Sequence, residues 1–257
     1  MGDKISLFST HIPTNAGQKV YELIKSGWIN RGKKAKEFEE KFKQKFGYRY
    51  ALSVNSCTSA LHLSYAMIKS STDARGGDEI ITTPYTMVAT NTAMLECGFK
   101  PVFADIKYGT ANIDPRSIED HITKKTKAIA IVHYGGYPCD MEMVNEIAIE
   151  HSLPVVEDCA QALGAMYDGE FVGQSEFSCF SFQAVKHITT GDGGMLITNR
   201  GAIYDEAVKR TWFGINKEER IKNELGAHPI DIISLGYKHT MNDIAATMGI
   251  EGLKDFD

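Results

Sequence analysis

The chain has 257 residues, of which 43% are hydrophobic and 24% charged, a balance typical of a soluble globular protein and not of disordered or fibrous chains. Its 28 Lys and Arg residues stand against 33 Asp and Glu residues, and this formal charge of -5 offers no positive field to hold nucleic acid. Apolar runs such as Ala128 to Val132 are far shorter than a membrane span, and the polar opening Gly2-Asp3-Lys4 is unlike a signal peptide. We therefore expect a cytoplasmic protein without nucleic-acid or membrane partners.

Five cysteines occur along the chain, and no two of them form a CxxC pair. An odd number in a chain of this length argues against a disulfide framework and against a zinc site. We expect no metal and reduced thiols in the core. The five are Cys57, Cys97, Cys139, Cys159 and Cys179.

Two helical patterns come first, over Gly17 to Lys25 and over Lys34 to Phe46. The second pattern places Phe38, Phe42 and Phe46 at positions i, i+4 and i+8, among many charged residues. The charge run is consistent with a docking surface, but a solvated helix with one apolar stripe is the favoured interpretation.

Short apolar runs then alternate with stretches of helical period. We expect strands over residues 50–54, 79–83, 101–106, 127–133 and 154–157, and helices over 58–68, 88–96 and 141–151. This alternation predicts a mostly parallel sheet with helices on both faces. Three closely spaced strands follow, around Phe171 and over residues 177–182 and 195–198, and their spacing predicts an antiparallel element in the sheet.

The last part of the chain has a weaker pattern. A helix is expected over residues 202–210, followed by an irregular region that contains Gly214, Gly226 and Pro229. A final helical pattern runs over residues 242–253.

Functional groups of an open parallel sheet are expected just after the strands, at their carboxyl ends. After residue 54 the small hydroxyl residues 55–62 open a helix, whose free N–H groups, with the hydroxyl of Thr58, are suited to a phosphate. Ser and Thr at such a junction also serve as plain helix caps, so both interpretations stay open.

Asp158 and Lys186 each follow a predicted buried strand. A carboxylate there is costly unless a cation meets it, and a desolvated lysine becomes a nucleophile toward carbonyl groups, although a surface lysine fits the pattern too. A phosphate cradle, an acid for a ring nitrogen and a lysine for an aldehyde together match pyridoxal 5'-phosphate. The Rossmann glycine pattern and the Walker lysine loop are both missing from the sequence.

A series of motifs from about Gly27 to Leu253 carries a family resemblance. The motifs are Gly27-Trp-Ile-Asn-Arg-Gly32, Asn55-Ser-Cys-Thr-Ser-Ala-Leu61, Gly77-Asp-Glu-Ile-Ile81, Pro101-Val-Phe-Ala-Asp105, Asn112-Ile-Asp114, Val132-His-Tyr-Gly135, Glu157-Asp-Cys-Ala-Gln-Ala162, Phe180 to Gly194, and Gly236-Tyr-Lys-His-Thr-Met-Asn-Asp243. With these motifs the chain resembles the DegT/StrS-type sugar aminotransferases, pyridoxal-phosphate enzymes of the aspartate aminotransferase fold superfamily.

The resemblance implies an α/β fold, a three-layer α/β/α large domain with a mostly parallel sheet. Residues 1–240 would form this cofactor-binding domain with its N-terminal helices, and residues 241–257 the truncated start of a C-terminal small domain that is largely absent. A fragment of a longer protein and a naturally short form are both open. The family also works as homodimers, so a homodimer is expected.

The resemblance also implies roles for individual residues. Lys186 would bond to the cofactor aldehyde and then move a proton between the substrate carbon and C4', while Asp158 would pair with the ring nitrogen. The other cofactor contacts would come from Gln161 at the ring face or its 3-hydroxyl, and from Ser181, Cys57 and Thr58 at the phosphate.

The chain departs from the family pattern at two of these positions. Met87 stands where an aromatic ring usually stacks on the cofactor, and a thioether can cover a ring face, although Met87 as core filler remains the alternative. Lys238 stands where an asparagine often reaches the phosphate of the neighbouring subunit's cofactor, or it is a surface residue. The mouth for the nucleotide sugar is expected at Trp28, Asn30, Arg31 and His133.

We expect a transaminase that converts a nucleotide-linked keto sugar to an amino sugar for surface polysaccharide or a glycoconjugate, with glutamate as donor. One branch of the family carries histidine in place of the reactive lysine and dehydrates the sugar, so Lys186 favours amino transfer although His187 adjoins it. A dehydratase and a non-catalytic binding or regulatory protein remain the alternatives. The sequence does not identify the sugar, the nucleotide, the ring position or the stereochemistry.

Overall fold

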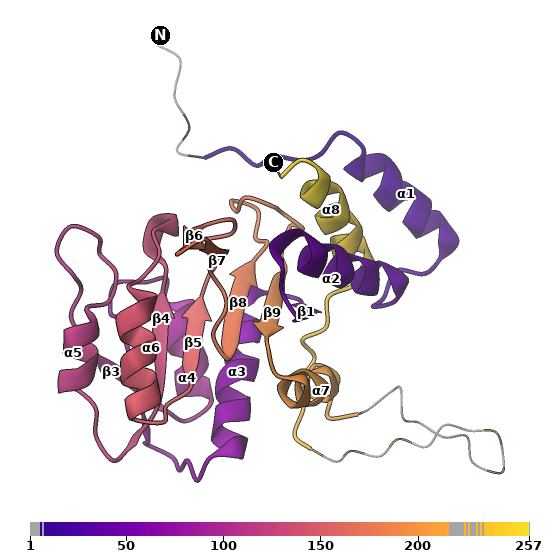
Figure 1. The fold of residues 1–257 in the computed structure, drawn as a ribbon. Coiled ribbons are helices and arrows are strands. Elements are labelled where there is room, and N and C mark those ends of the chain that lie inside the picture. Colours follow the sequence, from indigo (N-terminus) through magenta and orange to yellow (C-terminus); the bar gives the residue numbers. More distant parts are fainter. Residues whose placement is uncertain are drawn as a thin grey trace.

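The computed structural model describes residues 6, 8–215, 224, 226, 230, 232 and 234–256, so Pro229 in the expected irregular region lies outside the described residues. Seven strands form one sheet in the order β1-β9-β8-β5-β4-β2-β3 (Figure 1). The strands are β1 (Tyr50–Val54), β2 (Glu79–Thr82), β3 (Lys100–Phe103), β4 (Thr126–Val132), β5 (Val155–Asp158), β8 (Phe177–Ser181) and β9 (Gly194–Thr198).

The pairing confirms the mostly parallel sheet. Strands β3, β2, β4, β5 and β8 are parallel to one another, while β9 lies antiparallel between β8 and β1. The strand expected around Phe171 forms outside the main sheet: β7 (Glu170–Phe171) pairs with β6 (Met166–Tyr167) in a small sheet of its own. Strand β7 ends at Phe171, and the N–H groups of Gly173 and Ser175 that follow it donate to the carboxylate of Glu157.

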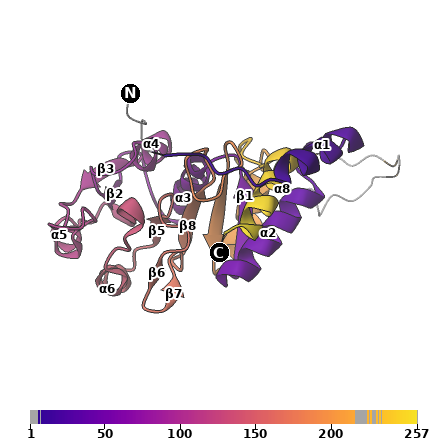
Figure 2. The same ribbon diagram turned by 90° about the horizontal axis from the view of Figure 1, so that it is seen from above.

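Helices cover both faces of the main sheet and complete the three layers. Figure 2 shows α3 and α4 on one side of the sheet and α2, α5 and α6 on the other. The helices are α1 (Ala16–Ser26), α2 (Lys33–Phe46), α3 (Cys57–Ser71), α4 (Ala89–Glu96), α5 (Pro115–Asp120), the 3-10 turn η1 (Tyr134–Gly136), α6 (Met141–Glu150), α7 (Gly201–Arg210) and α8 (Asp243–Lys254).

Strand β4 shows how the sheet builds two cores. Ala128 and Ala130 pack into the core beneath α3, whereas Ile129 and Ile131 pack into the core beneath α5 and α6. Successive side chains of a strand point to opposite faces, so a strand covered on both sides has to be apolar throughout. This double burial explains the continuous apolar run that the sequence shows here.

Helix α2 confirms the expected apolar stripe. Phe38 and Phe42 are fully buried and Phe46 is 2% exposed, and the Phe42 ring meets Phe180 of β8 edge-on with a centroid distance of 5.6 Å. Helix α8 packs on α2, so the last helical pattern of the sequence completes this core. Glu39 is an exception among the charged residues of α2, because it is 5% exposed.

Candidate active site

Residues from five segments meet at the carboxyl ends of β5 and β8. Gly194 of β9 lies opposite Val54 of β1 and Ser181 of β8, and Asp158 of β5 lies opposite Cys179. The first residue of α3 reaches the same place, since Cys57 Sγ lies 4.0 Å from Asp158 Oδ1. The strand ends thus bring together residues more than a hundred positions apart in the chain.

Asp158 is a buried carboxylate, 4% exposed. Its Oδ2 accepts a hydrogen bond of 2.7 Å from the Thr90 hydroxyl and its Oδ1 accepts one of 3.0 Å from Ala160 N–H. Burial raises the pKa of the Asp158 carboxyl, while these two hydrogen bonds and the positive charge of Lys186 act in the opposite direction. Among the residues that the structure describes, Asp158 has no ion-pair partner, so its carboxylate remains suited to a cation.

Lys186 is half-buried in the turn that follows β8, where its N–H donates to the carbonyl of Gln183 at 2.9 Å. Its positive charge acts to lower the pKa of Asp158 and of Cys57, although burial raises both pKa values. No carboxylate in the described part of the chain pairs with this amine. Asp158 and Lys186 are therefore opposite charges that form no ion pair with each other in the described structure.

The start of α3 offers open backbone N–H groups beside this site. Ser56 caps the helix by accepting from Ser59 N–H at 3.0 Å, which leaves Cys57 N–H and Thr58 N–H without a partner in the described residues. A side chain at Gly194 would place its Cβ 2.6 Å from Cys57 N, so glycine allows the close approach. Free N–H groups at a positive helix end bind anions.

Gln161 follows Asp158 by three residues, and the oxygen of its side-chain amide already accepts a hydrogen bond. Its Oε1 accepts a hydrogen bond of 2.8 Å from Gly135 N–H, which leaves the amide nitrogen without a partner among the described residues. Met87, in the loop between β2 and α4, is 65% exposed and is not core filler. Ser181 is 8% exposed, and its hydroxyl accepts a long hydrogen bond of 3.4 Å from Gln183 N–H.

Two of the residues expected at the substrate mouth line a cavity of their own, and their role there stays a prediction. Trp28 and Arg31 line a separate cavity of about 1390 Å³ between α2 and α7, to which neither Asp158 nor Lys186 contributes. The Arg31 guanidinium is bound by Glu39 at 2.8 Å and by the Ser53 hydroxyl at 2.8 Å, because the buried Glu39 carboxylate requires a cation. The side chain of Asn30 accepts from Arg31 N–H and so shapes this turn.

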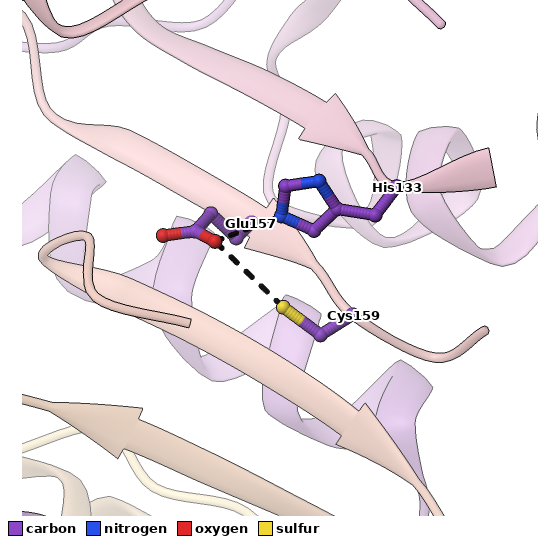
Figure 3. A group of neighbouring side chains, drawn as sticks. All are labelled: His133, Glu157 and Cys159. Carbon is purple, nitrogen blue, oxygen red and sulfur yellow. Dashed lines mark hydrogen bonds and ion pairs between the residues drawn. The ribbon is translucent and has the colours of Figure 1, made fainter. Parts of the chain in front are cut away.

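His133 differs most from its expected place at the mouth. It is fully buried, and its Nε2 lies 2.8 Å from Glu157 Oε2 (Figure 3). Its Nδ1 accepts a hydrogen bond from Cys139 N–H at 3.0 Å. Cys159 lies beside them, so the three side chains could be mistaken for a metal site. Because Nδ1 is an acceptor, the neutral ring carries its proton at Nε2, which leaves no lone pair there for a cation.

Lys238 is exposed, with its Nζ 3.9 Å from the centre of the Trp212 ring. This cation–π contact holds the side chain on its own subunit. The backbone of Lys238 accepts from Asn55 Nδ2 at 3.3 Å, directly before the start of α3. Its expected reach to a neighbouring subunit stays a prediction.

Comparison with known protein families identifies the family of this chain. The model of the DegT/DnrJ/EryC1/StrS aminotransferase family matches residues 11–257. The chain belongs to this family. Among relatives of the DegT/DnrJ/EryC1/StrS family, the spore coat polysaccharide biosynthesis protein SpsC of Bacillus subtilis is 38% identical over 245 residues, which cover 93% of this chain and 61% of SpsC.

Two further relatives support the same family assignment. The GDP-perosamine synthase of Escherichia coli O157:H7 is 34% identical over 255 residues, covering 98% of this chain and 66% of the synthase. Spr1654 of Streptococcus pneumoniae, solved in a PLP form, superposes with a TM-score of 0.89 at 28% identity, covering 99% of this chain and 67% of that chain. The chain thus spans about three fifths of the length of SpsC. No helix among the described residues has both the length and the apolar character needed to cross a membrane.

Two polar residues at this DegT/DnrJ/EryC1/StrS family site were missed by the sequence analysis. Thr90, fully buried on α4, donates to Asp158, and its hydroxyl lies 2.8 Å from that of Thr86. Glu157 binds His133 on the opposite face of β5. The spacing of Thr86 and Thr90 matches one helical turn and was the available signal, whereas nothing in the sequence distinguishes Glu157 from a solvated acid.

Proposed function

We propose that this chain carries the cofactor-binding part of a pyridoxal-phosphate-dependent aminotransferase that converts a nucleotide-linked keto sugar to an amino sugar, with glutamate as donor. The observation that carries the proposal is the buried Asp158 carboxylate, which has no ion-pair partner among the described residues and lies 4.0 Å from Cys57 Sγ at the open start of α3. Membership of an aminotransferase family and the names of the sugar-processing relatives support it.

The residues present fit the three handles of pyridoxal phosphate. The N–H groups of Cys57 and Thr58, with the hydroxyl of Ser181, would hold the phosphate, since they combine open donors with a positive helix end. Asp158 would hold the protonated ring nitrogen, and Lys186 would take the aldehyde. Gln161 would approach the 3-hydroxyl with its free amide nitrogen, and exposed Met87 would cover a ring face.

When bound, the cofactor supplies a ring that accepts the electron pair released at the substrate carbon. The task of Asp158 is then to stay ionised and keep a proton on the ring nitrogen, and the donors Thr90 and Ala160 oppose the effect of burial on its charge. The Lys186 amine would move a proton between the substrate carbon and C4' of the cofactor. It is available for this role because no carboxylate in the described part of the chain forms an ion pair with it.

The wider assignment is also part of this proposal. A nucleotide sugar as substrate follows the GDP-perosamine synthase among the relatives, and surface polysaccharide as the product's destination follows SpsC. We further propose a cytoplasmic homodimer, with residues 1–240 as the cofactor-binding domain and residues 241–257 as the start of a small domain. The proposed role of Lys238 is to reach the cofactor phosphate of the neighbouring subunit, for which it would leave Trp212.

The direct test supplies purified protein with pyridoxal phosphate, glutamate and a panel of nucleotide-linked keto sugars. The expected result is an amino sugar nucleotide, detected by mass spectrometry, together with one 2-oxoglutarate for each amine transferred. A deoxygenated sugar nucleotide would instead indicate the dehydratase, and cofactor binding without any product would indicate a binding protein.

A further inference from the structure

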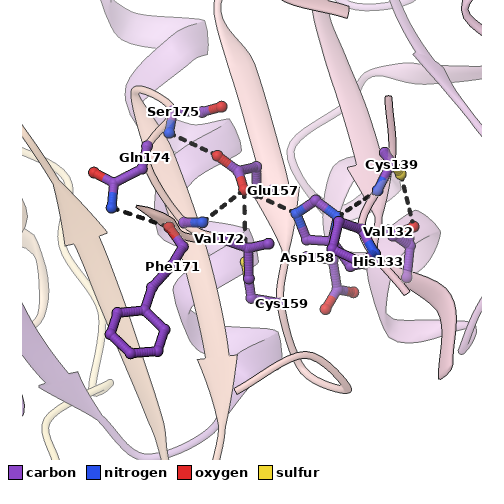
Figure 4. A network of polar contacts seen from close by, with 12 residues as sticks. Val132, His133, Cys139, Glu157, Asp158, Cys159, Phe171, Val172, Gln174 and Ser175 are labelled. Carbon is purple, nitrogen blue, oxygen red and sulfur yellow. Dashed lines mark hydrogen bonds and ion pairs between the residues drawn. The ribbon is translucent and has the colours of Figure 1, made fainter. Parts of the chain in front are cut away.

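The face of β5 opposite Asp158 carries a second buried carboxylate. Glu157 is 1% exposed, and its side chain points away from that of Asp158 (Figure 4). Adjacent residues of a strand point to opposite faces, and Val155 packs into the core with α6, so Glu157 lies on that side of the sheet. Its Oε2 accepts from His133 Nε2 and Gly173 N–H, both at 2.8 Å, and its Oε1 accepts from Ser175 N–H at 2.6 Å. Three donors therefore hold the carboxylate in one orientation.

No positive charge neutralises Glu157 among the residues that the structure describes. His133 accepts from Cys139 N–H at Nδ1, so its ring is neutral and donates its one proton to the carboxylate. The Lys and Arg side chains of the described ion pairs bind other acids. A carboxylate that is fixed by neutral donors alone keeps its full negative charge.

The other titratable groups around Glu157 are uncharged acids. Burial, together with the negative charge of Glu157, raises the pKa of Cys139 to about 12 and raises the pKa values of Cys159 and Tyr48. The hydrogen bonds from His133, Gly173 and Ser175 favour the ionised form of the Glu157 carboxyl. The thiols and the phenol around Glu157 therefore add no further charge to this face.

We propose that Glu157 is a positioning residue that acts through Asp158: its unneutralised charge, one residue away on the other face of β5, strengthens the hold of Asp158 on a protonated ring nitrogen. This inference rests on the proposed cofactor site. In a buried sheet the field of a carboxylate is poorly screened, and a second negative charge behind Asp158 favours a cation in front of it. His133 then serves to supply a hydrogen bond without supplying a charge.

The test compares holoenzymes by a pH titration of the absorbance of bound pyridoxal phosphate. Glu157→Gln keeps the size of the side chain and removes its charge. We expect the pKa of the bound cofactor to fall by about half a unit to one unit in this variant, and the dissociation constant of the cofactor to rise about three- to tenfold. The matched control is His133→Gln, which retains both the charge of Glu157 and an N–H donor to it, and is expected to titrate like the wild type.

Each outcome has one meaning. Wild-type protein that takes up no pyridoxal phosphate would contradict the proposed function itself. Wild-type protein that binds it, with a folded Glu157→Gln that titrates unchanged, would overturn only the role of Glu157. Equal shifts in Glu157→Gln and His133→Gln would also overturn it, because they would indicate packing and not charge. If circular dichroism shows that Glu157→Gln is unfolded, His133→Lys cancels the same charge from the other side, and an unchanged cofactor pKa in that variant counts equally against the proposal.

Discussion

Asp158 is the residue whose placement is costly for the fold and useful for the chemistry. Its pKa is raised in the folded chain, so the folded state binds more protons than the unfolded state between the unfolded and the folded pKa, and stability falls as the pH rises through that window. We expect Asp158→Asn to raise the free energy of unfolding of the cofactor-free protein by about 1 kcal/mol or more at neutral pH. The same change should weaken pyridoxal phosphate binding and lower turnover about a hundredfold or more.

Thermal unfolding and cofactor titration check this pair of effects. Asp120→Asn, at an exposed end of α5, is the matched control and should change neither quantity. A less stable cofactor-free Asp158→Asn protein, or one that binds the cofactor with wild-type affinity, would contradict the assignment.

Thr90 tunes Asp158 through one hydrogen bond of 2.7 Å. This bond lowers the pKa of Asp158, so Thr90→Val should raise that pKa and move the acid limb of cofactor binding upward by about half a unit to one pH unit. Thr92→Val, on the same helix but bonded to the carbonyl of Val88, is the control. Identical pH profiles for Thr90→Val and the wild type would show that the hydroxyl is irrelevant to the carboxylate.

At the scale of elements, the junction of β9 with α3 sets the proposed phosphate site. A Cβ at Gly194 would lie 2.5 Å from the backbone carbon of Ser56 and 2.6 Å from Cys57 N, so Gly194→Ala must displace the start of α3. We expect a loss of about 1–3 kcal/mol of stability and a larger loss of phosphate affinity, measured by denaturant unfolding and by cofactor titration. Gly76→Ala, which meets nothing within 4 Å, is the control. Unchanged cofactor affinity in Gly194→Ala would show that this junction does not contribute to phosphate binding.

The elements that build the site were largely predictable from the sequence. Apolar alternation placed β1, β4 and β5, and β9 was recognised from its short distance to β8. Helix α5 was missed although Asp114 caps it and Pro115 occupies its first turn, because its six residues are too few to establish a period. The hairpin of β6 and β7 was half missed for the same reason, since each of its strands has two residues.

The individual contacts were less predictable, because they depend on which charges the fold buries. Arg31 was assigned to a substrate, but the fold turns it toward Glu39, and His133 was assigned to the mouth, but the fold buries it against Glu157. In both cases a buried acid takes the donor, and no local pattern identifies an acid as buried. Asp158 was more readily recognised because the end of a parallel strand is where ligands bind.

In the molecule as a whole, strand β5 carries two buried carboxylates, with Asp158 on one face of the sheet and Glu157 on the other. Asp158 lies beside the start of α3, 4.0 Å from Cys57 Sγ, and Glu157 accepts hydrogen bonds from His133 and Gly173 on the opposite face. Two buried negative charges on adjacent residues destabilise the cofactor-free protein. The arrangement is understandable if a cation binds on the Asp158 side, and the stability of the protein should therefore depend on its cofactor.

The central claim is that the amine of Lys186 takes the aldehyde of pyridoxal phosphate. The most direct measurement is borohydride reduction of the protein with its cofactor, followed by peptide mass spectrometry. The account predicts one phosphopyridoxyl group, on Lys186, its loss in Lys186→Ala, and its retention in Lys125→Ala, which changes an exposed lysine. Labelling of Lys186→Ala at another lysine to the wild-type extent, or no label on the wild-type protein, would contradict it.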